Sequence, residues 1–120
     1  MGKKILVVDD AVFMRTTVSN ALKKAGYEEL IDAGNGAQAV EQFSKEHPDL
    51  VIMDITMPEM DGLQALKAIK EIDPGAKVVM CSAMGQEAMV IEAINLGALD
   101  FIVKPFKPDR LLKTVSTILG

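Results

Sequence analysis

Short apolar runs recur along the chain and are separated by longer segments of mixed polarity. The runs cover residues 5–8, 30–33, 50–53, 78–81 and 101–103, and polar or turn-forming residues flank each one. All except the second lack the alternation of apolar and polar positions that half-exposed strands show, which is typical of strands buried on both faces of a parallel sheet. We therefore expect five short strands with helices covering both faces.

The intervening segments carry apolar residues at helical spacing, for example at Val18 and Leu22 in the first segment and at Leu111 and Val115 in the last. Glycines fall near three of the expected helix ends, at Gly26, Gly75 and Gly97. The order βαβαβαβαβα, joined by right-handed crossovers, predicts a three-layer doubly wound α/β domain of the flavodoxin-like kind. An α/β barrel is excluded because it needs about twice this length.

Composition narrows the functional class. A chain of 120 residues fits one domain, and 49% hydrophobic with 25% charged residues is a globular balance rather than a disordered one. The net charge of −4 disfavours binding to a phosphate backbone, so no nucleic-acid partner is expected. Cys81 is the single cysteine, which predicts a buried reduced thiol. Since no run is long enough for a signal peptide or a membrane span, we expect a soluble, cytoplasmic protein without membrane partners.

Polar side chains stand where four of the five expected strands end. Asp9 and Asp10 follow the first strand, Asp54 closes the third, Ser82 closes the fourth and Lys104 follows the fifth. Because parallel strands end at the same edge of a sheet, these side chains should converge on one rim. Two carboxylates about 4 Å apart repel by roughly 4 kcal/mol at an effective dielectric constant of about 20. Fold stability alone therefore does not favour this cluster.

A divalent cation would reverse the sign of that interaction, and carboxylate oxygens, a backbone carbonyl and water suit Mg²⁺. Lys104 could face the oxygens of an incoming phosphoryl group, and Ser82 could donate a hydrogen bond to it. Under these conditions a carboxylate can attack phosphorus and hold the group as an acyl phosphate. The rim therefore predicts Mg²⁺-dependent phosphoryl chemistry.

Four segments together resemble the receiver domain of two-component response regulators. They are KILVVDD at 4–10, DLVIMDITMPEMDG at 49–62, CSA at 81–83 and GALDFIVKPF at 97–106. The resemblance covers the whole chain, so residues 1–120 are expected to form a single receiver domain with no output domain, most similar to the chemotaxis regulators of this family. It implies the strand order 2-1-3-4-5 with five helices, an order that periodicity does not give.

The resemblance also assigns roles at the rim. It implies that Asp54 is the phosphoacceptor, that Asp9, Asp10, Asp54 and the Thr56 backbone carbonyl bind Mg²⁺, and that Lys104 contacts the phosphoryl group. Such a protein is not an enzyme in the usual sense, although it catalyses its own phosphorylation and dephosphorylation. Its implied partners are a histidine kinase as donor, a flagellar motor switch protein and a phosphatase, and it is expected to be a monomer.

A conformational switch is implied at Ser82 and Phe101, where a phosphoryl group would draw the Ser82 hydroxyl inward and vacate space for the Phe101 ring. Many members carry Thr and Tyr at these places, so the missing methyl and hydroxyl predict a looser switch. Receivers usually hold the bond between the residues equivalent to Lys104 and Pro105 in the cis form, and we expect the same here.

Other interpretations compete with this one. Within the family, the chain could be a phosphorelay intermediate or an adaptor. A flavodoxin-like FMN carrier shares the element order, but Asp9 and Asp10 would repel a phosphate without a metal. An aspartate-nucleophile phosphatase is suggested by Asp54-Ile55-Thr56, but many such enzymes need an acid where Thr56 stands. Multiple turnovers of a phosphate ester would favour that enzyme.

Some residues have simpler explanations. Taken alone, Asp9 and Asp10 are explained better as an N-cap pair than as ligands, and only Asp54 with Lys104 reverses that preference. Asp61 before Gly62 is expected to cap a helix. Four methionines are expected on or beside the rim loops as adaptable contact points, although a core position is an equal alternative for the last: Met57, Met60, Met84 and Met89.

Overall fold

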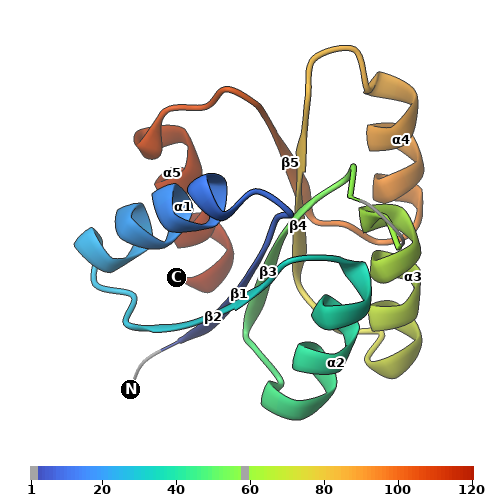
Figure 1. Ribbon diagram of the computed structural model, residues 1–120, viewed down its shortest axis with the longest axis horizontal. Helices are drawn as coiled ribbons and strands as arrows, with labels where there is room; N and C mark the ends of the chain where they lie inside the picture. The colour runs from blue at the N-terminus through green and yellow to red at the C-terminus, as the bar shows by residue number, and fades with distance from the viewer. Residues whose placement is uncertain (1–2, 58–59) are drawn as a thin grey trace.

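The elements alternate between strand and helix along the whole chain. The computed structural model describes residues 3–57 and 60–120, which form five strands and five helices (Figure 1). In chain order they are β1 (Lys4–Val8), α1 (Val12–Lys24), β2 (Glu29–Ala33), α2 (Gly36–Glu46), β3 (Leu50–Asp54), α3 (Gly62–Ile72), β4 (Val78–Ser82), α4 (Glu87–Asn95), β5 (Asp100–Val103) and α5 (Pro108–Leu119).

All strand pairs are parallel and the sheet order is β2-β1-β3-β4-β5. Helices α1 and α5 cover one face of the sheet, and α2, α3 and α4 cover the other (Figure 1). The predicted three-layer doubly wound fold and its strand order are confirmed. Among the described residues, none of the helices is both long enough and apolar enough to span a membrane.

Two hydrophobic clusters, one on each face, explain why most of the strands read as unbroken apolar runs. In β1, Ile5 and Val7 pack in the cluster under α1 and α5, whereas Leu6 and Val8 pack in the cluster under α2, α3 and α4. Successive side chains alternate between the faces, and both faces are covered, so every position is apolar. The strand β2 lies at an edge and is only partly buried, which is why a polar residue, Asp32, interrupts its apolar run.

The start of α3 packs closely against the end of β3. Asp61 is the N-cap of α3 and forms a reciprocal capping box with Gln64, as expected for a cap. The backbone N–H of Gly62 donates to the carbonyl of Ile55 at 2.7 Å. This bond fixes the helix against the loop that follows Asp54, and so links the position of α3 to that of the rim.

Candidate functional site

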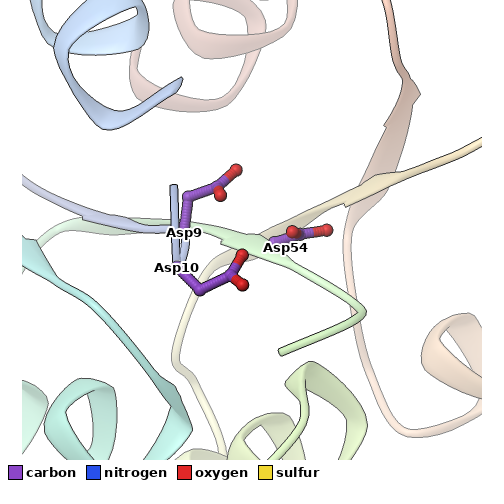
Figure 2. A group of neighbouring side chains, drawn as sticks. All are labelled: Asp9, Asp10 and Asp54. Atoms are coloured by element: carbon purple, nitrogen blue, oxygen red, sulfur yellow. The ribbon is translucent and has the colours of Figure 1, made fainter. Parts of the chain in front are cut away.

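Three carboxylates from two strand ends meet at the carboxyl edge of the sheet. Val8 pairs with Met53 in the β1–β3 register, so Asp9 and Asp10 emerge beside Asp54. One oxygen from each of the three aspartates lies within 4.8 Å of the others (Figure 2). Asp9 and Asp54 are buried and Asp10 is exposed, so the cluster opens to solvent on one side.

The two adjacent aspartates do not cap α1. Its N-cap is Ala11, which makes no side-chain cap, and the Asp9 carboxylate accepts the N–H of Ala11 at 2.9 Å. The explanation of Asp9 and Asp10 as an N-cap pair is therefore wrong. Their crowding with Asp54 needs another cause.

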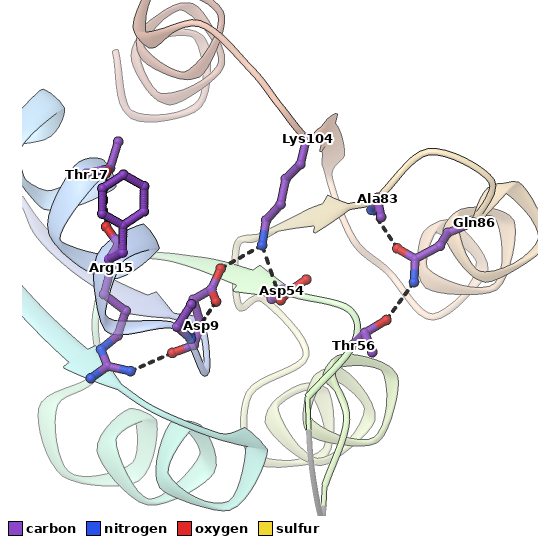
Figure 3. Close-up of polar contacts among 10 residues, drawn as sticks. Asp9, Arg15, Thr17, Asp54, Thr56, Ala83, Gln86 and Lys104 are labelled. Atoms are coloured by element: carbon purple, nitrogen blue, oxygen red, sulfur yellow. Dashed lines mark hydrogen bonds and ion pairs between the residues drawn. The ribbon is translucent and has the colours of Figure 1, made fainter.

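Lys104 directly follows β5 and approaches the carboxylates from there. Its Nζ lies 2.7 Å from Asp9 Oδ2 and 3.2 Å from Asp54 Oδ2 (Figure 3). Its backbone N–H donates to the carbonyl of Ser82 at 2.7 Å, which ties the ends of β4 and β5 together. The peptide bond between Lys104 and Pro105 is cis.

The charges of this cluster are only partly balanced. Burial raises the pKa of the Asp54 carboxyl because desolvation disfavours its charged form, and the charge of Asp9 adds to this against the opposing charge of Lys104. For Lys104, burial lowers the pKa, but the hydrogen bond to Asp9 and the charges of both carboxylates outweigh it and the pKa is raised. One ammonium group among three carboxylates leaves an excess of negative charge.

The donor set fits a hard divalent cation. Three carboxylate oxygens converge within 4.8 Å, and the exposure of Asp10 leaves a side on which water can complete the coordination. Oxygen ligands with several waters retained are the combination that Mg²⁺ prefers. Thr56, whose carbonyl is a predicted ligand, is an exposed residue two positions beyond Asp54, and that role stays a prediction.

Ser82 and Phe101 line a common groove. Ser82 is buried at the end of β4, and Phe101 is half-buried in β5 against the cluster under α2, α3 and α4. A largely apolar groove of about 480 Å³ runs beside both residues between the β4–α4 loop, α4 and β5. Its wall includes the exposed side chains of Met84, Ile91 and Val103. The proposed switch pair is therefore placed beside an unfilled surface groove.

Two polar side chains at the rim were not foreseen. Arg15 donates to the carbonyl of Asp9 at 2.6 Å (Figure 3). It also pairs with Asp32, with its Nε 3.2 Å from Asp32 Oδ2. Gln86 joins the backbone N–H of Ala83 to the hydroxyl of Thr56 (Figure 3). The sequence signal for both was weak, because a helical Arg and a loop Gln are usually solvated.

The methionine predictions were correct only in part. Met84 is 80% exposed at the rim, as expected of a contact point, but Met57 is 6% exposed and belongs to the cluster under α2, α3 and α4. Met60 and Met89 are partly buried against the same cluster. The Met57 side chain is buried although its neighbour Thr56 is exposed, and position along the sequence could not show that difference.

Comparison with known proteins places this site in a family. Residues 5–116 match the response regulator receiver domain. The chain is 58% identical to the chemotaxis protein CheY of Bacillus subtilis over 100% of both chains, and 56% identical to CheY of Thermotoga maritima over 98% of both. A crystal structure of a CheX–CheY–BeF3–Mg complex from Borrelia burgdorferi is similar with a TM-score of 0.93 and 35% identity, covering 98% of this chain and 90% of that one.

The chain therefore belongs to the response regulator receiver domain family, and the resemblance noted from its motifs is confirmed. Within that family its relatives include CheY proteins at 58% and 56% identity, which confirms the predicted similarity to chemotaxis regulators. Membership supports a phospho-accepting role in two-component signalling. It also makes the chain a signalling protein rather than a classical enzyme.

Proposed function

We propose that the protein is a Mg²⁺-dependent phosphorylation switch in which Asp54 accepts the phosphoryl group. The observation that carries this proposal is the placement of the buried Asp54 carboxylate between two other acids and the Lys104 ammonium group. A buried carboxylate whose pKa is raised by desolvation is costly to the fold, and such groups concentrate at functional sites.

In the proposed step, a carboxylate oxygen of Asp54 forms a bond to phosphorus while the bond between phosphorus and the donor atom breaks. The donor atom, a histidine nitrogen of a kinase or an oxygen of acetyl phosphate, leaves with the electron pair. Water later attacks phosphorus, which releases inorganic phosphate and restores the carboxylate. Lys104 lies 3.2 Å from Asp54 Oδ2 and stabilises the phosphoryl oxygens through its charge.

Asp9, Asp10, Asp54 and the Thr56 carbonyl would hold Mg²⁺. When bound, the ion would neutralise charge on the carboxylates and on the transferred group. Arg15 fixes the backbone of Asp9 through its carbonyl, and so keeps the two adjacent acids at the rim.

For the output, the new phosphoryl oxygens would draw in the Ser82 hydroxyl and let the Phe101 ring move, which would change the shape of the groove that both residues line. A histidine kinase would supply the phosphoryl group, a dedicated phosphatase would remove it, and a flagellar motor switch protein in the cytoplasm would read the groove. The similarity to CheY proteins supports a motor switch protein as the output partner, rather than the function of an adaptor or a phosphorelay intermediate.

Acetyl phosphate tests the acceptor. The protein incubated with acetyl phosphate and Mg²⁺ is expected to gain the mass of one phosphoryl group, because the donor needs no kinase. Intact-mass measurement should show no gain for Asp54→Asn or when EDTA replaces Mg²⁺. Asp49→Asn is the matched control, since its carboxylate accepts the N–H of Lys4 at the other end of the sheet. A mass gain on another residue would refute the assignment.

Purified motor switch protein from the same organism tests the output. Beryllofluoride with Mg²⁺ is expected to raise the affinity of the protein for this partner about tenfold or more, because coupling between two sites typically amounts to about 1–3 kcal/mol. Isothermal titration calorimetry with and without the mimic measures the ratio. A ratio of one would defeat the motor proposal and favour the phosphorelay or adaptor function.

A further inference from the structure

Gln86 bridges two loops beside the candidate site. Its Oε1 accepts the backbone N–H of Ala83 at 2.6 Å, and its Nε2 donates to Thr56 Oγ1 at 2.5 Å (Figure 3). Both ends of one amide are therefore used, and they connect the loop after β4 to the loop after β3. We call this arrangement of Gln86, Ala83 and Thr56 the Gln86 clamp.

The clamp joins the two loops that flank the proposed acceptor. Thr56 stands two residues after Asp54, and Ala83 directly follows Ser82. Asp54 and Cys81 are register partners in the β3–β4 pair, so the two loops leave adjacent strands side by side. A hydrogen-bonded bridge between these loops restrains the residues that must respond when a group is added to Asp54.

The Ala83 N–H would have a stronger acceptor once Asp54 is phosphorylated. A phosphoryl group brings charged oxygens to the end of β3, and hydrogen bonds to an ionised acceptor are roughly twice as strong as those to a neutral one. The neutral amide oxygen of Gln86 would then compete poorly for this backbone donor. Any inward movement of Ser82 also carries Ala83 with it, because the two residues share a peptide bond.

We infer that Gln86 is a positioning residue that stabilises the unphosphorylated arrangement of the two loops and is released when a phosphoryl group occupies Asp54. The inference rests on the proposed phosphorylation of Asp54. Contacts present in only one of two states bias the equilibrium toward that state. Removing the clamp should therefore shift the protein toward the phosphorylated arrangement and raise its apparent affinity for a phosphoryl mimic.

The test is a titration with beryllofluoride in the presence of Mg²⁺, followed by NMR of the backbone amides. Gln86→Leu removes both hydrogen-bonding groups at similar size, and it should bind the mimic about fivefold more tightly than the wild type, as expected for two partly exposed hydrogen bonds. Gln38→Leu is the matched control. Gln38 accepts the N–H of Gly34 at 2.8 Å in the loop before α2, so it makes the same kind of bond away from the acceptor. The affinity of Gln38→Leu for beryllofluoride should equal that of the wild type.

Thr56→Val distinguishes the clamp from a local effect of residue 86. Valine matches the shape of threonine and keeps the backbone carbonyl, but it removes the hydroxyl that accepts from Gln86. This variant should also bind the mimic more tightly, and the double variant should gain little beyond Gln86→Leu, since both remove the same bridge.

The outcomes separate this inference from the proposed function. If the wild type binds the mimic and Gln86→Leu binds it equally or more weakly, the clamp does not stabilise the unphosphorylated arrangement. Additive effects of Gln86→Leu and Thr56→Val would also overturn the inference. A wild type that does not bind the mimic would instead refute the proposed function of Asp54, and this inference would fail with it.

Discussion

Replacing Lys104 by Met is expected to slow phosphoryl transfer from acetyl phosphate about a hundredfold while tightening Mg²⁺ binding roughly tenfold. The first effect follows because the substitution removes the only ammonium group, among the described residues, that makes an ion pair with Asp54. The second follows because the same ammonium group lies 2.7 Å from Asp9 Oδ2, where it competes with a bound cation for the carboxylate. Intact-mass kinetics and calorimetric Mg²⁺ titration measure the two quantities.

The opposite signs of these effects identify the role of the ammonium group. A variant that merely loosens the fold should both slow phosphoryl transfer and weaken Mg²⁺ binding. Loss of a positive charge from the acidic rim should instead slow transfer and tighten Mg²⁺ binding. Lys107→Met is the matched control, because Lys107 is exposed at the N-cap of α5. It should leave both quantities within twofold of the wild type, a margin typical of surface substitutions. Wild-type transfer rates in Lys104→Met would exclude the proposed contact with the phosphoryl group.

The sheet could be predicted from the sequence because both of its faces are buried. The strands β3 and β4 are buried at every position, so the selection for apolar residues left runs that stand out in the chain. The strand β2 shows the limit of this signal, since an edge strand with exposed Glu29 and Asp32 is less distinct. The order of the strands came from resemblance to a family, because alternation of strands and helices allows more than one order.

The acidic rim was predictable for a geometric reason. Parallel strands end at one edge, so Asp9, Asp54 and Lys104 had to converge although up to 95 positions separate them in sequence. The Gln86 clamp and the Arg15 contact with Asp9 depend instead on how loops and long side chains turn, which periodicity does not report. The burial of Met57 belongs to the same class, since the sequence does not report which side chains of a loop face the core.

Gly62 is a position where one added Cβ atom would disturb both the fold and the site. It is the first residue of α3, where alanine would ordinarily stabilise a helix by up to about 1 kcal/mol relative to glycine. Here a Cβ atom would clash with the carbonyl oxygen of Asp54 and would lie 2.8 Å from the Cα of Ile55. Both obstacles are backbone atoms, so no side-chain rotation can remove them.

Gly62→Ala is therefore expected to destabilise the protein by about 3 kcal/mol, whereas helix propensity alone would predict stabilisation. For a domain of this size that corresponds to a fall in Tm of about 10 °C, which calorimetry can measure. Gly75→Ala is the matched control, because the nearest described atom to its Cβ would be Asp73 Oδ1 at 3.4 Å, an ordinary contact. Its Tm should stay within about 2 °C of the wild type.

The same clash should also reduce phosphorylation in the folded fraction of Gly62→Ala. The backbone that must move to admit the methyl group is that of Asp54 and Ile55, and Asp54 carries the proposed acceptor carboxylate. A displacement of about 1 Å at a reacting group commonly lowers rates by up to a hundredfold, so acetyl phosphate labelling should slow well below the loss expected from unfolding alone. If Gly62→Ala were as stable as the wild type and labelled at the same rate, the close packing of α3 against the acceptor strand would not constrain the site.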